Sequence, residues 1–379
     1  MITMVHVFVV DETTFKYHLE YLFAGIGAKD KTAPFLNNAF ISYPATTERM
    51  LVGMIADISR IRIGDKVIFY LQATAHSQGM FYGVFKVASA PFFDENDNSN
   101  YLLRQMGKGL SFRVLLEPDT VYSKGVTEHE YLDSLTGKNH PYDLCWSLIY
   151  RKLKGKRGCT MIMDYEYDDL LAKLITKNNN TSLAGNAFTF DCNSYEIISA
   201  PTTNIYQGRQ NQLNILNRLL FKANNGNAFE THLQAYITQN IDSQILSNLL
   251  LPLPGNNAWV GNEVSCGVGM QRIDIMIKQE TVTDVYIRLV ELKDEAPYLN
   301  IILYQIPWYL KWLSDYVIPK YQDKTIHLLP TIIAKGNLDA NLRTQYQNFT
   351  YPINNVDVQP LQFIGFTTNN GEINFIKYL

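Results

Sequence analysis

The sequence predicts an α+β protein of two domains, the first rich in β-strands and the second a mixed sheet flanked by helices. The chain has 379 residues, which is more than one typical domain needs. Strand-like runs separated by glycine-marked turns fill the first part, whereas helical and strand patterns alternate in the second. A stretch rich in Asn, Ser, Thr and Gly lies between them and predicts a flexible linker. We therefore expect domains at 1–176 and 206–379, joined by a linker at 177–205.

The first domain is expected to contain a β-hairpin. Residues 64–72 and 79–89 are rich in aromatic and β-branched residues and flank a short polar loop, a pattern typical of two paired strands. Residues 110–117 predict another strand. Residues 165–175 have helical spacing and an acidic first turn, so they predict a helix.

The second domain is expected to alternate helices with strands. The apolar spacing predicts helices at 209–223, 228–241 and 299–317 and strands at 270–279, 284–293, 325–334 and 361–368. Such an order is typical of an α/β unit with a mixed sheet.

The composition excludes several classes of protein. Hydrophobic residues make up 46% and charged residues 18%, as in a soluble globular protein, and no apolar run approaches the roughly 20 residues of a membrane span. The N-terminus lacks the features of a secretory signal, and the four cysteines are far apart, which fits a reducing cytoplasm. His140 near Cys145 does not supply a four-ligand zinc site. The net charge is −3, so any contact with a polyanion must come from local clusters.

The stretch VELKDE contains the first candidate site. Glu291 and Lys293 are two residues apart on a predicted strand and therefore share a face. Taken alone, such a pair is most often an exposed ion pair. Asp274 lies on the preceding strand, however, and a short turn between the strands would bring both carboxylates to one edge. Two carboxylates there would bind a hard divalent cation such as Mg²⁺, with Mn²⁺ as a substitute.

Two neighbouring helices add to this pattern. Glu230 on the preceding helix could supply an outer carboxylate, and Gln305 with Tyr309 forms a Q-x-x-x-Y on the following helix. Asp294 and Glu295 are interpreted as solvated residues past the end of the strand.

The order helix-Glu, strand-Asp, strand-E-x-K and helix-QxxxY over residues 210–320 resembles the PD-(D/E)XK nuclease superfamily. The resemblance implies a Mg²⁺-dependent phosphodiesterase, with catalytic residues Glu230, Asp274, Glu291, Lys293 and Gln305, of which Asp274 and Glu291 bind the metal. Two features depart from the family pattern. Ile273 replaces the usual proline, and Pro307 lies inside the QxxxY helix, where it removes a backbone hydrogen bond unless it is in the first turn.

The segments IRIGDKVIFYLQ and GMFYGVFKVASAPFFD, with a closing segment at 143–162, resemble the PUA-like fold, in particular its EVE and YTH-like members. The resemblance implies a small β-barrel that holds a flipped, modified base in an aromatic pocket. The candidate pocket residues are Trp146, Tyr82, Tyr70, Asp65 and Ser147. The alternative is that these rings belong to the core, since alternate residues of a strand point inward.

Five basic residues in seven positions form the densest positive cluster of the chain, Arg151, Lys152, Lys154, Lys156 and Arg157. They are candidates for contacts with the DNA backbone, which position a duplex without reading its sequence. The alternative is a solvated surface loop.

Together these features predict a modification-dependent restriction endonuclease of the prokaryotic cytoplasm. It would flip out a methylated or hydroxymethylated cytosine in double-stranded DNA and hydrolyse phosphodiester bonds. A homodimer is expected, because cutting both strands requires two active sites. The alternatives are a repair or structure-specific nuclease that ignores modification, and a nucleic-acid-binding protein without activity. An RNA substrate for the reader domain also stays open.

Overall fold

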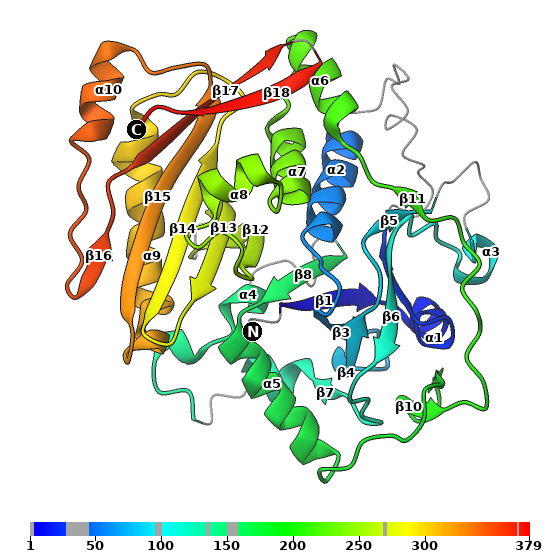
Figure 1. Cartoon of the computed structure of the whole chain (residues 1–379). Helices are drawn as coiled ribbons and strands as arrows, with labels where there is room; N and C mark the ends of the chain where they lie inside the picture. Colours follow the sequence, from blue (N-terminus) through cyan, green and yellow to red (C-terminus); the bar gives the residue numbers. More distant parts are fainter. Residues whose placement is uncertain are drawn as a thin grey trace.

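The computed structural model describes residues 4–27, 45–94, 101–133, 137–149, 158–267, 271–369 and 371–379. Two large sheets lie beside one another, with helices between and around them (Figure 1). The chain is therefore a mixed α+β protein, as the sequence predicts. None of the described helices combines the length and the apolar character that crossing a lipid bilayer requires.

The first sheet has nine strands, and its pairing path runs β11-β5-β6-β4-β3-β1-β8, with β2 beside β6 and β7 beside β4. Its strands are β1 (Val5–Val10), β2 (Phe23–Ile26), β3 (Lys66–Leu71), β4 (Met80–Val87), β5 (Phe92–Phe93), β6 (Phe112–Pro118), β7 (Val126–Thr127), β8 (Cys159–Ile162) and β11 (Asn211–Gln212). The antiparallel pair β3–β4 confirms the predicted hairpin. The path ends at β11 and β8, so strand pairing among the described residues does not close the predicted barrel.

Helices surround this sheet, namely α1 (Glu12–Glu20), α2 (Ala45–Ser59), α3 (Leu103–Met106), α4 (Trp146–Ile149) and α5 (Asp164–Lys177). Asp11 caps α1, because its side chain accepts a hydrogen bond from the backbone N–H of Thr14 at 2.8 Å. Alternate residues of the strands enter separate cores on the two faces of the sheet. Phe69 and Tyr82 lie in one core and Tyr70 and Phe81 in the other.

The predicted linker is part of this first unit and is not a free connection. Strands β9 (Phe188–Asp191) and β10 (Glu196–Ser199) pair as a hairpin inside the range 177–205. Phe190 is buried and packs on Phe15 with 4.9 Å between ring centroids. Strand β11 then pairs with β5, so the chain leaves the first unit only near residue 215. The stretch is mostly polar and therefore predicts a linker, but a few of its large apolar side chains are buried in the first unit.

The second sheet has seven strands in the order β12-β13-β14-β15-β17-β18, with β16 beside β15. They are β12 (Trp259–Ser265), β13 (Arg272–Glu280), β14 (Asp284–Leu292), β15 (Thr325–Lys335), β16 (Val356–Val358), β17 (Gln362–Asn369) and β18 (Glu372–Lys377). Strands β14, β15 and β17 are parallel, and β13 is antiparallel to β14. The predicted strands of this domain are confirmed.

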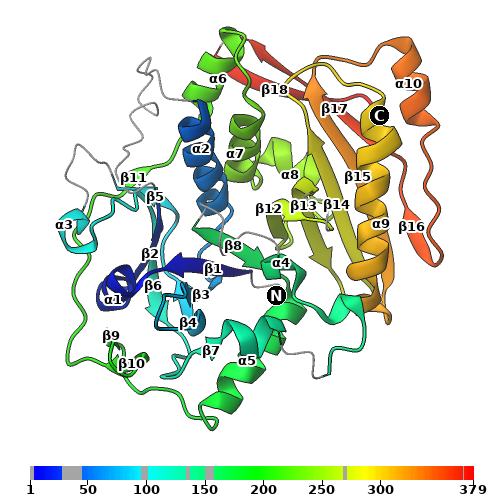
Figure 2. The ribbon, with the colours of Figure 1, turned by 180° about the vertical axis from the view of Figure 1, so that it is seen from behind.

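Five helices accompany this sheet: α6 (Leu216–Asn224), α7 (Glu230–Asn240), α8 (Gln244–Leu250), α9 (Ile306–Tyr316) and α10 (Ala340–Gln347). Helix α9 covers one face, whereas α7 and α8 lie on the opposite side, as Figures 1 and 2 show from the two directions. The helix predicted at 209–223 begins only at Leu216, because the residues before it contain β11.

The two units share a closely packed contact. Trp259 of β12 donates its indole N–H to the carbonyl of Ile162 in β8 at 2.9 Å, and both residues are buried. Helix α2 packs along α7, where Glu48 accepts hydrogen bonds from Arg218 and lies 2.8 Å from His232 Nε2. Burial and side-chain hydrogen bonds therefore hold the units together, in addition to the chain between them.

Candidate active site

Strands β13 and β14 bring the predicted acidic residues together. Ile275 pairs with Val290, so Asp274 and Glu291 lie next to each other at the same end of the sheet. Asp274 accepts a hydrogen bond from the backbone N–H of Leu292 at 2.7 Å through Oδ2. Its Oδ1 makes no hydrogen bond to the described part of the chain. One carboxylate oxygen is thus fixed by the strand while the other stays available for a ligand.

Glu291 is held by three side chains. It is 2% exposed, and Oε1 accepts hydrogen bonds from Lys293 Nζ at 2.6 Å and Gln305 Nε2 at 2.8 Å. Tyr309 lies on the other side, with its hydroxyl 2.7 Å from Oε2 and 2.8 Å from the carbonyl of Arg272. A buried carboxylate needs such partners, because burial removes its hydration. The predicted Q-x-x-x-Y therefore fixes the orientation of Glu291.

Pro307 does not break the helix that carries these residues. It lies at the start of α9, in the first turn, where its missing N–H costs no helical hydrogen bond. A π-helical turn at Ile301–Gln305 precedes it and turns Gln305 toward Glu291. The proline within the Q-x-x-x-Y motif is therefore compatible with the helix.

Glu230 completes the group at the first turn of α7. Its Oε2 lies 3.5 Å from Lys293 Nζ, and its side chain is 38% exposed. Asp294 accepts hydrogen bonds from the backbone N–H groups of Phe229 at 2.5 Å and Glu230 at 3.1 Å. Asp294 therefore caps α7. The interpretation of Asp294 as a solvated residue was wrong. No local pattern near Phe229 revealed this, since the cap comes from a residue far along the chain.

The charges of this group are unevenly matched. Burial, together with the nearby charges of Glu291 and Glu230, raises the pKa of Asp274 well above its ordinary value. Burial also raises the pKa of Glu230. Burial alone would lower the pKa of Lys293, but the attraction of Glu291 and Glu230 outweighs it, so that pKa is raised. One ammonium thus faces three carboxylates, and a further cation would relieve their repulsion.

A divalent metal fits this donor set in part. No group of three or more His, Cys, Asp or Glu side chains among the described residues could hold a metal ion by itself. Asp274 and Glu291 nevertheless offer two carboxylates at one edge of the sheet. Such a pair suits Mg²⁺, which keeps several water ligands and takes others from a substrate phosphate.

Two of the candidate pocket residues, Tyr70 and Tyr82, do not share a pocket. Tyr70 and Tyr82 are buried in cores on opposite faces of the first sheet, where their hydroxyls bond to Glu128 at 2.9 Å and to the carbonyl of Tyr195 at 2.7 Å. Successive residues of a strand point to opposite faces of the sheet, so these rings belong to the core, which is the alternative stated in the sequence analysis. Ser147 donates its backbone N–H to Glu166 at 3.0 Å. The side chain of Trp146 and the cluster Arg151, Lys152, Lys154, Lys156 and Arg157 lie outside the described residues.

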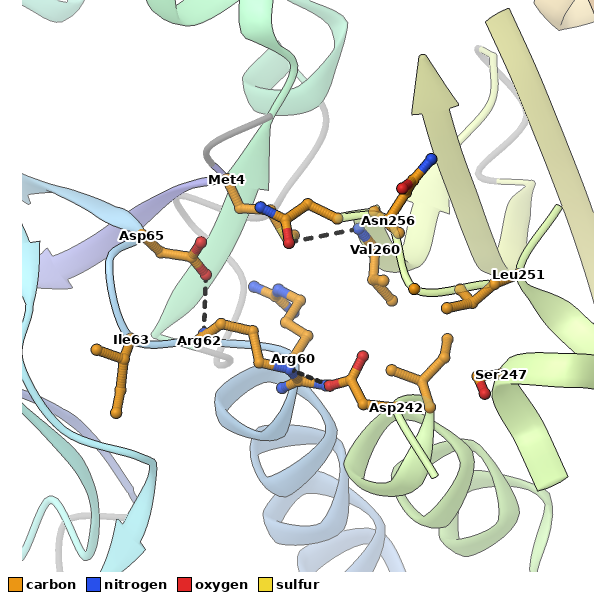
Figure 3. A pocket seen from close by; sticks show the side chains of 14 residues that line it. Met4, Arg60, Arg62, Ile63, Asp65, Asp242, Ser247, Leu251, Asn256 and Val260 are labelled. Atoms are coloured by element: carbon orange, nitrogen blue, oxygen red, sulfur yellow. Dashed lines mark hydrogen bonds and ion pairs between the residues drawn. The ribbon is translucent and has the colours of Figure 1, made fainter. Parts of the chain in front are cut away.

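Asp65 lines a different cavity, of about 500 Å³, at the contact between the two units (Figure 3). It lies 2.8 Å from His6 Nε2 and accepts the backbone N–H of Arg62 at 2.8 Å. Arg62 bridges to Asp242 across the cavity at 2.6 Å. The carboxylate of Asp65 is therefore already engaged by its own unit, and the cavity it borders lies where the units meet.

Comparison with known proteins gives distant similarities only. No family of known proteins matches the sequence, and no curated protein is similar to it. A hypothetical protein from Leishmania major is similar at 11% identity and a TM-score of 0.30, over 46% of this chain and 97% of its own. The human THYN1 protein, solved in complex with DNA containing 5-methylcytosine, is similar at 8% identity and a TM-score of 0.28. The similarity covers 45% of this chain and 97% of the THYN1 chain. A protein from Pseudomonas putida is similar at 10% identity and a TM-score of 0.26. The similarity covers 44% of this chain and 97% of the Pseudomonas putida chain.

Proposed function

We propose that this chain is a Mg²⁺-dependent DNA endonuclease. The observation that supports the proposal is the grouping of Asp274, Glu291 and Lys293 at one end of a mixed sheet, with Glu230 beside Lys293. Oxygen ligands and an ammonium at one place are what phosphodiester hydrolysis requires. The raised pKa of Asp274 adds to this, because the group gains from a bound cation.

Each side chain has a role in this proposal. A bound Mg²⁺ would lower the pKa of a coordinated water and neutralise charge on the phosphate. Asp274 and Glu291 would hold it, while Gln305 and Tyr309 keep Glu291 in place. Lys293 would stabilise the negative charge that develops on the phosphate, and Glu230 orients its ammonium.

The N-terminal unit is proposed as a reader of modified cytosine in double-stranded DNA. This finer proposal rests on the resemblance of the segments around Gly64–Asp65 and 79–89 to PUA-like readers. A homodimer belongs to it, because cutting both strands takes two active sites. A second candidate is a nuclease that ignores modification. It is favoured by one observation, namely that the described pocket candidates are buried apart from each other.

Cleavage by purified full-length chain, with and without Mg²⁺, tests the nuclease. Lys293→Ala and Asp274→Ala should reduce cutting by at least about 10²-fold, the usual cost of removing a group that stabilises the transition state, while DNA binding is retained. Lys311→Ala is the matched control, since this lysine is exposed and pairs only with Asp315 within the described part of the chain. Absence of any Mg²⁺- or Mn²⁺-dependent cutting by the wild type would leave a binding protein instead.

Matched duplexes with cytosine, 5-methylcytosine or 5-hydroxymethylcytosine test the reader separately. Preferential cutting of one modified duplex supports the modification-dependent enzyme. Equal cutting of all three removes that part of the proposal and supports the modification-independent nuclease.

A further inference from the structure

The second sheet has a cavity on the face away from Glu291. Arg288 and Glu291 are three residues apart on β14, so their side chains point to opposite faces. The cavity measures about 470 Å³, within the range of about 300–1,000 Å³ that small-ligand pockets have. Residues of helix α8 and the loop that follows it line one side of the cavity, and residues of β14 and β15 line another.

Arg288 lies at this cavity without an ionic partner among the described residues. It is 5% exposed, and its Nε donates to the carbonyl of Leu250 at 2.6 Å. Its Nη1 donates to Thr331 and Gln362, each at 2.7 Å. All three acceptors are neutral, and Nη2 makes no hydrogen bond to the described part of the chain. Burial lowers the pKa of Arg288 to about 10.

Asp357 lines the cavity, where its carboxylate is engaged by the side chains of His327 and Gln359. His327 lies between Asp357 at 2.8 Å and Asp284 at 3.0 Å. These hydrogen bonds outweigh the effect of burial and raise the pKa of His327, so the three groups largely satisfy one another. Lys377 also lines the cavity and forms no ion pair within the described residues. Among the described residues that line the cavity, Arg288 and Lys377 are the cations that form no ion pair.

The rest of the lining suits an organic group beside an anion. Tyr286 and His327 stack with ring centroids 4.5 Å apart and an interplanar angle of 12°. Leucine and proline side chains form the opposite wall, and the amides of Gln359 and Asn248 border the cavity. Apolar surface with a few polar groups is the usual lining of a small-molecule site. A guanidinium edge with two free N–H donors suits the oxygens of a phosphate.

We propose that this cavity binds a mononucleotide, with its phosphate on Arg288 and Lys377 and its base against the apolar and aromatic walls. The site is separate from the candidate active site and does not depend on the nuclease proposal. The cavity is lined by α8, the loop after it, and residues of β14, β15, β16, β17 and β18.

Calorimetric titration of the full chain with each deoxynucleoside monophosphate tests the proposal. EDTA and the Asp274→Asn variant exclude binding at the candidate active site. We expect one saturable site per chain for at least one mononucleotide. The matching nucleoside and inorganic phosphate should each bind at least 10-fold more weakly, because each engages only part of the cavity.

Three variants locate the site. Arg288→Lys keeps the charge but loses the planar fork, and should weaken binding at least 10-fold. Lys377→Ala, at an exposed position that leaves the fold intact, should weaken it several-fold, whereas Lys311→Ala on the other side of the sheet should not. The proposal is overturned if no mononucleotide saturates the wild type. It is equally overturned if Lys377→Ala and Arg288→Lys bind as the wild type does, or if phosphate alone binds as tightly as the nucleotide.

Discussion

Asp294 accepts a hydrogen bond from the backbone N–H of Glu230 at 3.1 Å, so the residue next to Lys293 fixes the start of the helix that carries Glu230. The distance between Glu230 and Lys293 therefore depends on a contact made by the same short segment as the E-x-K motif. A negative charge at a helix N-terminus also interacts favourably with the helix dipole.

Asp294→Ala removes this cap and should destabilise the protein by about 1 kcal/mol, with a loss of activity from the displaced Glu230. Asparagine caps as well as aspartate, so Asp294→Asn should restore most of both. Thermal unfolding and cleavage rates of the two variants give the comparison. If both variants cut as slowly as each other, the charge of Asp294 matters and its capping role does not.

Tyr309→Phe should lower activity about 10-fold or more, because it removes a hydrogen bond to the buried carboxylate of Glu291. Tyr304→Phe is the matched control, since that ring is 68% exposed. Calorimetric titration with Mn²⁺ measures the same effect without cleavage, as a weaker affinity in the first variant alone. Unchanged Mn²⁺ affinity and activity in Tyr309→Phe would mean that the hydroxyl does not position Glu291.

The contribution of Asp274 to the stability of the metal-free protein should fall as the pH rises from about 4 toward neutrality. The pKa of Asp274 is raised by folding, so the folded state retains a proton that the unfolded chain loses above the ordinary carboxyl pKa of about 4. The pKa of Glu230 is also raised by folding, so its contribution to stability falls over the same rise in pH. Asp274→Asn should therefore stabilise the metal-free protein at pH 7.5 but not at pH 4.

Mg²⁺ should reverse this loss, with a larger rise in melting temperature at pH 8 than at pH 5.5. Thermal scans of the wild type and Asp274→Asn at the two pH values measure it. Asp315→Asn, on the exposed side of α9, is the control that should behave as the wild type. A Mg²⁺ effect of equal size at both pH values, or one that persists in Asp274→Asn, would contradict this prediction.

Glu48→Ala should destabilise the whole chain by about 3–5 kcal/mol, because it leaves the buried Arg218 without this carboxylate. Glu48 and Arg218 belong to different units, so the loss should appear as one cooperative transition at a lower temperature. Calorimetry checks this, with Glu117→Ala as an exposed control. Two separate transitions, with only one of them shifted, would show that the units unfold independently.

The sequence indicated that the residues of the candidate active site lie close together, because the pattern is local. Glu291 and Lys293 lie two residues apart at the end of one strand, Asp274 lies on its hairpin partner, and Gln305 and Tyr309 are one helical turn apart. Their role in catalysis stays a prediction. The capping role of Asp294 was not predicted, because its hydrogen-bond partners lie at the start of a helix more than sixty residues earlier in the sequence.

The linker and the base pocket were less predictable for a related reason. Phe188, Phe190 and Ile197 occupy a polar stretch, and only the tertiary core into which they insert reveals their role. Tyr70 and Tyr82 are both strand aromatics, and the sequence does not show that one faces each side of the sheet. The reader function of the N-terminal unit stays a prediction.

The hydrogen bond from Trp259 to Ile162 and the packing of α2 on α7 have one more consequence. In the proposed endonuclease, this contact would hold the recognising unit and the cutting unit at a fixed separation along the DNA. The offset between a recognised base and the broken bond would then be constant from one site to the next.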